Sequence, residues 1–145
     1  MQRINMREPT KDLNGNDLFI RVMTDNRLHE TIRAEEGEVI IQEGEATNQA
    51  YIILYGEVEV RRGGDDGIPK YVTTLKENQV FGELAMIDGL RRSASCIARS
   101  TVILAEITHD QYIEMCKEKP EILLPLLRVL SERMRKTSEF IDRVV

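Results

Sequence analysis

The sequence predicts an α+β fold, in which an antiparallel β-roll or sandwich is followed by helices, and three observations support it. Short apolar runs recur between residues 28 and 108 and are separated by clusters of glycine, aspartate and asparagine, as in antiparallel strands joined by turns. After residue 108 the apolar spacing lengthens to that of helices. The chain has 145 residues, the size of one domain. We therefore expect a polar lead-in over residues 1–27, the roll over 28–108 and C-terminal helices over 109–145.

The composition argues against several classes of protein. Hydrophobic residues make up 41% of the chain and charged residues 31%, as in soluble globular proteins. A net charge of −5 disfavours direct nucleic-acid binding, and the sequence has neither a signal peptide nor a membrane-spanning stretch. We expect a cytoplasmic protein without a membrane partner. Cys96 and Cys116 are predicted to be buried thiols, and the two isolated histidines, His29 and His109, to be surface or capping residues without a metal.

The lead-in carries two turn signals and one short apolar patch, which predict a helical turn or two. In the roll, the best-defined strand spans residues 58–62, where Val58 and Val60 alternate with charged residues and so face one side. This strand ends at a hairpin tip, GGDDGIP, whose glycines permit positive φ angles. The strand-like runs are TIRA, EVII, QAYIILYGEVEVRR, KYVTTL, SASCIARS and TVILAEI.

Two prolines divide the C-terminal helices. Residues 109–118 predict a short helix, and Pro120 suits the first turn of another. Pro125 would break a helix that began at Pro120, so either a single turn precedes a new helix at Pro125 or one helix is kinked. From Pro125 to Val145 the sequence reads as one helix of about 31 Å at 1.5 Å per residue.

The last helix carries two apolar faces. One has the alternating four- and three-residue spacing of a coiled coil, which favours a homodimer seam over burial within a monomer. The other can pack on the roll. Thr137 is the polar member of the seam, and its hydroxyl either bonds its own helix or meets a polar ligand. The seam residues are Leu123, Leu127, Leu130, Met134, Thr137, Ile141 and Val144, and the second face holds Leu126, Val129 and Phe140.

The segment FGELAMIDGLRRSAS, residues 81–95, has the residues of an anion site. Glu83 to Asp88 can form a short helix, with Gly82 before it and Gly89 at its C-terminal cap. The N–H groups of Leu84 and Ala85 would then be free for a ligand.

Arg92 and Ser93 are predicted to lie on the strand that follows the short helix. The Arg92 guanidinium and the Ser93 hydroxyl are groups that suit a phosphate bound at this site. Arg91 would point to the opposite face. Glu83 would repel a phosphate, so its expected partner is a sugar hydroxyl beside it. Together these residues predict a site for a small, singly charged nucleotide, because the sequence has no P-loop lysine or Mg²⁺-binding motif.

This segment closely resembles the phosphate-binding cassette of cyclic-nucleotide-binding domains, as found in regulatory subunits of cyclic-AMP-dependent protein kinase. A second segment, which precedes the cassette in the chain, resembles another signature of the family. This segment is EEGEVIIQEGEATNQAYIILYGEVEV, with Gly37, Gly44 and Gly56 at the expected turns. The C-terminal stretch KPEILLPLLRVLSERMRKTSEFI resembles the corresponding helix of the bacterial catabolite activator. The resemblance covers residue 28 to the end and implies a jelly-roll-like antiparallel β-roll.

The resemblance also implies roles for individual residues. Thr137 and Ser138 would contact the base, which favours cAMP, although a hydroxyl at Ser93 occurs in both cAMP- and cGMP-binding members. Gly82 and Glu83 would bind ribose. Besides Ser93, two departures stand out. Asn78 replaces the usual turn glycine, where we expect the turn to survive, and the spacing from Glu83 to Arg92 follows the kinase version although the last helix follows the bacterial one.

We therefore interpret the chain as a non-enzymatic cyclic-nucleotide receptor without a cofactor, its ligand cAMP or, alternatively, cGMP. It would signal through its last helix, as a homodimer or to a downstream protein partner. The bacterial relatives would continue into a DNA-binding helix-turn-helix, which this chain lacks, so it is either a sensor fragment or a stand-alone receptor. The alternative from another class is an interaction module that does not bind nucleotide in the cell.

Overall fold

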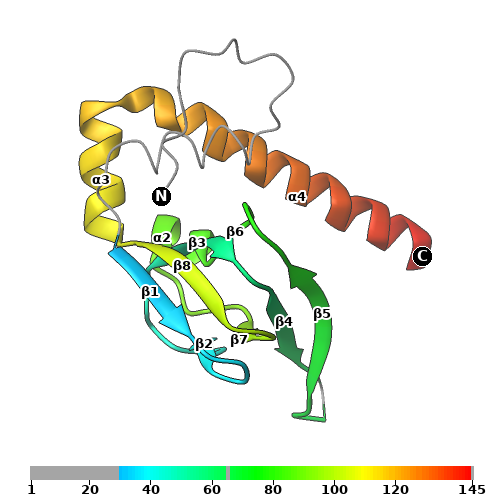
Figure 1. The fold of residues 1–145 in the computed structure, drawn as a ribbon. Coiled ribbons are helices and arrows are strands. Elements are labelled where there is room, and N and C mark those ends of the chain that lie inside the picture. The colour runs from blue at the N-terminus through cyan, green and yellow to red at the C-terminus, as the bar shows by residue number, and fades with distance from the viewer. Residues whose placement is uncertain (1–29, 65, 145) are drawn as a thin grey trace. The chain divides into compact units, whose positions relative to one another are not determined.

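The computed structural model describes residues 30–64 and 66–144, with side chains given up to residue 139. The expected α+β fold with an antiparallel β-roll is confirmed (Figure 1). The predicted lead-in at residues 1–27 lies outside the described residues, as does His29. Within the described part of the chain, no helix has the length and apolar character needed to cross a membrane.

Eight antiparallel strands form two four-stranded sheets, ordered β1-β8-β3-β6 and β2-β7-β4-β5. The strand at residues 58–62 is confirmed as β4, and the predicted hairpin joins it to β5. A two-residue strand, β6, has no counterpart among the predicted runs, because two residues are too few for an alternating pattern. The strands are β1 (Glu30–Ala34), β2 (Val39–Ile41), β3 (Ala50–Tyr55), β4 (Val58–Gly63), β5 (Pro69–Leu75), β6 (Val80–Phe81), β7 (Ser95–Ala98) and β8 (Val102–Ile107).

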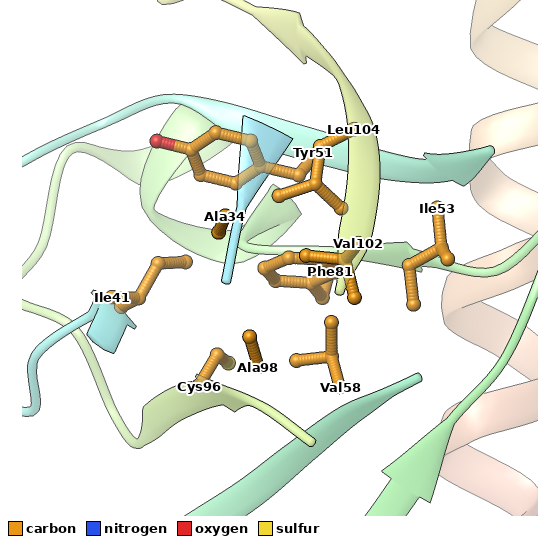
Figure 2. Close-up of a cluster of buried hydrophobic side chains, with 10 residues drawn as sticks. All are labelled: Ala34, Ile41, Tyr51, Ile53, Val58, Phe81, Cys96, Ala98, Val102 and Leu104. Atoms are coloured by element: carbon orange, nitrogen blue, oxygen red, sulfur yellow. The ribbon is translucent and has the colours of Figure 1, made fainter. Parts of the chain in front are cut away.

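The core lies between the two sheets (Figure 2). Val58 on β4 has no exposed surface, as the alternation predicts, and it shares the cluster with Val102 and Leu104 on β8, which are also fully buried. Cys96 is buried here, while Cys116 is half-buried. The cluster comprises Ala34, Ile41, Tyr51, Ile53, Val58, Phe81, Cys96, Ala98, Val102 and Leu104.

The turn that carries the departure from the family's glycine keeps its backbone conformation. Asn78 has a φ of 68°, and it is the one non-glycine residue with positive φ in the described chain. Asparagine tolerates this left-handed region better than most residues. The expectation that the turn survives is confirmed.

The helices follow the predicted order with one difference in their boundaries. The helix at residues 109–118 is confirmed as α3 (His109–Glu118), and a single 3₁₀ turn (Pro120–Ile122) precedes α4 (Leu123–Val144). Of the two alternatives, the structure therefore shows a single turn before a new helix, and that helix begins at Leu123, two residues earlier than predicted. Pro125 falls in the first turn, where a backbone N–H has no intrahelical acceptor, so its ring costs no hydrogen bond.

The described chain divides into two compact units, one containing residues 30–64 and 66–113 and the other containing residues 114–144. In the second unit, α4 has apolar side chains of two kinds. Leu126 and Val129 are buried, whereas Leu127 is 60% and Met134 71% exposed. The seam therefore presents apolar surface to solvent in the single chain.

Candidate functional site

Helix α2 (Glu83–Asp88) is the short helix that the sequence predicts. Both ends are set by glycines in the left-handed region, Gly82 with a φ of 77° and Gly89 with a φ of 69°. The N–H of Gly89 donates to the carbonyl of Ala85 at 2.9 Å, which closes the C-terminal cap. Glu83 is 3% exposed and opens the helix, and Leu84, which follows it, is exposed.

Arg92 is buried, with 5% of its surface exposed, and its guanidinium is held by three oxygens. Nε donates to Oγ1 of Thr47 at 2.9 Å, Nη1 to the carbonyl of Gly82 at 3.0 Å and Nη2 to the carbonyl of Gln49 at 2.7 Å. All three acceptors are neutral, and none of the ion pairs found among the described residues includes Arg92. Within the described part of the chain, neutral oxygens thus hold this buried positive charge.

The electrostatics of Arg92 reflect this arrangement. Burial lowers the pKa of Arg92, because it disfavours the charged guanidinium. Attraction from negative charge on surrounding groups, Glu45 and Glu83 among them, opposes this shift but does not cancel it. A buried charge is ordinarily paired with a group of opposite charge.

The backbone around Arg92 is fixed by the loop between β2 and β3. The N–H of Arg92 donates to the carbonyl of Glu45, and its carbonyl accepts from the N–H of Gly44, both at 2.9 Å. Strand β7 begins only at Ser95. The prediction that Arg92 and Ser93 lie on a strand is therefore wrong, because Arg92 pairs with a turn and not with a strand.

Arg91 and Arg92 differ as the sequence predicts. Arg91 is exposed, and its Nη1 donates to the carbonyl of Gly44 at 2.9 Å. Ser93 is also exposed, and its carbonyl accepts from Nε of Arg62 at 3.1 Å. Of three consecutive polar residues, only Arg92 extends into the protein.

The sequence pattern of one known family, the cyclic nucleotide-binding domain, matches residues 31–119. The chain belongs to this family. Apart from Glu30 at the start of β1, the matched range covers all the strands and α2, so the cassette segment and Arg92 lie within it.

Several relatives of this cyclic nucleotide-binding domain are known. A CRP-like cAMP-activated global transcriptional regulator of Mycobacterium tuberculosis is 32% identical over 102 residues, which are 70% of this chain and 46% of that protein. A cyclic nucleotide-binding domain from Methylobacillus flagellatus shares the fold, with a TM-score of 0.77 and 23% identity over 95% of this chain and 78% of that one. The chain spans about half, or less, of the length of the curated relatives it matches.

The EAL enzyme Bd1971 has been solved in cAMP-bound and cGMP-bound forms. These are 34% identical to this domain, with TM-scores of 0.59 and 0.60. They align with 78% and 79% of this chain and with 30% and 31% of that protein.

The structure of this cyclic nucleotide-binding domain brings together some of the predicted ligand-binding residues. The carbonyl of Gly82 accepts from Arg92, and Glu83, Leu84 and Ala85 follow Gly82 directly in α2. Ser93 adjoins Arg92 in the chain. Thr137 and Ser138 lie on α4, in the other unit. Their predicted contact with a base stays a prediction.

The sequence leaves two partners open for the Thr137 hydroxyl, its own helix or a polar ligand. Its Oγ1 donates to the carbonyl of Arg133, one helical turn earlier, at 3.0 Å. The hydroxyl is therefore satisfied within its own helix. Its oxygen keeps lone pairs that can accept from an amino group of a ligand.

His109 is a capping residue, one of the two roles that the sequence predicts for it. Its Nδ1 lies 2.6 Å from the carbonyl of Met86 in α2, so Nδ1 carries the proton and donates. That carbonyl is in the last turn of α2, where it lacks a helical donor. Thr108 and Gln111 cap the start of α3 reciprocally, which places His109 at its first position. His109 thereby connects α2 to α3.

Tyr51 forms a buried contact beside the cassette. Its ring stacks on Phe81, with centroids 5.2 Å apart, and only 7% of its surface is exposed. Burial, together with the charge and hydrogen bond of Glu106, raises the pKa of Tyr51 to about 12. Attraction to Arg92 acts in the opposite direction, so the phenol lies within the electrostatic range of the guanidinium.

This shift predicts a loss of stability at alkaline pH. Between pH 10 and about 12 the unfolded chain has lost the Tyr51 proton while the folded chain keeps it, so the free energy of unfolding falls as pH rises. Tyr51→Phe should remove this part of the decline, about 2–3 kcal/mol at 1.36 kcal/mol per pKa unit. Urea unfolding from about pH 8 to 11.5 measures it, with the exposed Tyr55→Phe as control. Parallel pH profiles for parent and Tyr51→Phe would contradict the assignment.

Sequence reasoning missed three groups around the cassette. They are the Thr47 hydroxyl and the Gln49 carbonyl, which hold Arg92, and the Glu106 carboxylate beside Tyr51. Thr47 and Gln49 belong to a polar run, EATNQ, that lacks periodicity. The one available signal was Gly44, which predicts a turn but not what the turn holds.

Proposed function

We propose that this domain is a non-enzymatic receptor for a cyclic nucleotide, with cAMP as its ligand. The observation that carries the proposal is the buried guanidinium of Arg92, held in place by neutral oxygens. An arginine fixed in this way keeps its charge and two of its five N–H donors for an anion, and a phosphodiester presents one negative charge. Membership of the cyclic nucleotide-binding domain family supports this ligand class.

Different residues of the cassette bind different parts of the ligand. Arg92 and Ser93 bind the phosphate, together with the N–H groups of Leu84 and Ala85 at the start of α2. Glu83 accepts from the ribose hydroxyl, beside the backbone of Gly82. Glu83 is buried next to a cation, and an anionic ligand could not share that carboxylate, which favours the neutral sugar.

The base is contacted by Thr137 and Ser138 on α4, which favours cAMP. A cGMP-preferring receptor is the alternative, because Bd1971 has been solved with either nucleotide. Titration calorimetry with cAMP and cGMP in parallel tests both points. We expect saturable binding of both, tighter for cAMP. A tighter cGMP isotherm would reverse the base preference, and the absence of heat with either would favour the interaction module.

We propose that α4 also forms a homodimer seam. Leu127 and Met134 lie on the seam and are largely exposed, and Leu123 is 42% exposed. Burial of such a stripe against a second copy contributes roughly 25 cal/mol per Å². Nucleotide would shift the equilibrium towards a closed state in which α4 covers the base, in proportion to its differential affinity for that state.

The seam makes a specific prediction for two neighbouring leucines on α4. Leu127→Lys should convert the protein to a monomer, because it places a charge in the seam. Leu124→Lys is the matched control, since Leu124 is 56% exposed but lies outside the seam spacing. Size-exclusion chromatography with light scattering should give about twice the 16.7 kDa of one chain for the parent and for Leu124→Lys. If the parent protein has the mass of one chain both in the presence and in the absence of cAMP, the proposed homodimer seam is contradicted.

A further inference from the structure

The guanidinium of Arg92 is held by two backbone carbonyls and one side chain. The carbonyls of Gly82 and Gln49 are present whatever the side chains at those positions. Among the described residues, Thr47 provides the one side-chain acceptor, at 2.9 Å from Nε. It is therefore the position at which a substitution can change the charge beside the guanidinium while the other two hydrogen bonds remain.

The chemistry of this acceptor matters because the guanidinium is buried. A hydroxyl orients Nε without neutralising its charge, whereas a carboxylate at the same distance would form an ion pair with it. Attraction between charges grows as water is excluded, so a carboxylate here would compete directly with an anionic ligand. The depressed pKa of Arg92 is consistent with a charge that its surroundings do not compensate.

We propose that Thr47 is a positioning residue that tunes the affinity of the site, because its neutral hydroxyl fixes Arg92 and leaves the positive charge for the ligand. This inference rests on the proposed binding of a cyclic nucleotide at Arg92. Thr47 itself is exposed, so its side chain can be exchanged without opening the core. The loop that carries it also fixes the backbone of Arg92 through Gly44 and Glu45, and the loop thus controls both the position and the charge environment of the arginine.

The effect of a negative charge beside the Arg92 guanidinium is tested by two isosteric variants, Thr47→Asp and Thr47→Asn. In the nucleotide-free protein, Thr47→Asp should unfold at a higher urea concentration than Thr47→Asn, because the aspartate compensates the buried cation. Titration calorimetry should show the reverse order for cAMP, with Thr47→Asp at least tenfold weaker than Thr47→Asn. Stability and affinity should therefore change in opposite directions, which a merely structural role of Thr47 would not produce.

The role of the Thr47 hydroxyl in orienting the Arg92 guanidinium is tested by Thr47→Ser and Thr47→Val. Serine keeps the hydroxyl, so its cAMP affinity and the ¹⁵N resonance of Arg92 Nε should match those of the parent. Valine has nearly the shape of threonine but no acceptor, and should shift that resonance and weaken binding about threefold to tenfold.

Equal cAMP affinity, or equal stability, of Thr47→Asp and Thr47→Asn would overturn the inference. A parent that binds neither cAMP nor cGMP would instead overturn the proposed function. The two failures are distinguishable, because the first requires a parent that binds.

Discussion

Arg92→Ala is expected to weaken cAMP binding by two to three and a half orders of magnitude. Removing one partner of a buried charge pair costs about 3–5 kcal/mol, and each 1.4 kcal/mol is a factor of ten in affinity. The site is particularly sensitive because, among the described residues, Arg92 is the one cation bonded to the oxygens of Thr47, Gly82 and Gln49. Titration calorimetry at fixed salt measures the loss.

Arg91→Ala is the matched control for this experiment. Arg91 has the same charge and is the adjacent residue, but it is exposed and bonds only the carbonyl of Gly44 among the described residues. Its cAMP affinity should stay within about threefold of the parent, since exposed charges contribute little. Urea unfolding of both variants separates loss of binding from loss of the fold. An Arg92→Ala protein that folds and binds cAMP within fivefold of the parent would remove Arg92 from the site.

Gly82→Ala is expected to damage both the fold and the binding site. A Cβ at Gly82 would lie 2.9 Å from Nη1 of Arg92, from the carbonyl oxygen of Gln49 and from Cδ1 of Ile41. The left-handed backbone adds about 1–2 kcal/mol of strain for any residue other than glycine. The guanidinium must therefore move, and we expect cAMP affinity to fall by about one to two orders of magnitude, with a loss of roughly 1–3 kcal/mol in the free energy of unfolding.

Gly89→Ala separates these two effects. Gly89 caps the other end of α2 with nearly the same φ, but a Cβ there meets no atom within 4 Å. This variant should lose about 1–2 kcal/mol of stability from backbone strain and bind cAMP like the parent. Equal losses of affinity in Gly82→Ala and Gly89→Ala would show that the cap geometry of α2, and not the contact with Arg92, limits binding.

Much of the roll could be predicted because its signals are local. The alternation at Val58 and Val60 identifies β4, and the glycines at 82 and 89 delimit α2 to the residue. Both patterns depend on neighbours in the chain, where side-chain period and backbone freedom decide the structure. Strand β6 was not predicted, because two residues are too few to show the alternation of apolar and polar side chains that identifies a strand.

The candidate site could be predicted only in part, because some of its contacts join residues far apart in the chain. Its central residue, Arg92, stands out by its motif, but two of the three groups that hold its guanidinium come from a loop more than 40 residues earlier in the chain. Contacts of that separation follow from how the two sheets close, and a single sequence does not carry them. The same loop explains the error at Arg92 itself, which is fixed by a turn at Gly44 and Glu45 and not by a strand.

The most direct test is to follow the cassette itself during nucleotide binding. In ¹⁵N-labelled protein titrated with cAMP, Nε–H of Arg92 and the backbone amides of Gly82, Leu84 and Ala85 should shift together and saturate at one nucleotide per chain. The same titration of Arg92→Lys should shift these amides only at much higher concentrations, because lysine lacks the planar fork. Saturating cAMP that leaves these four resonances in place, or shifts only those of another surface, would contradict the account.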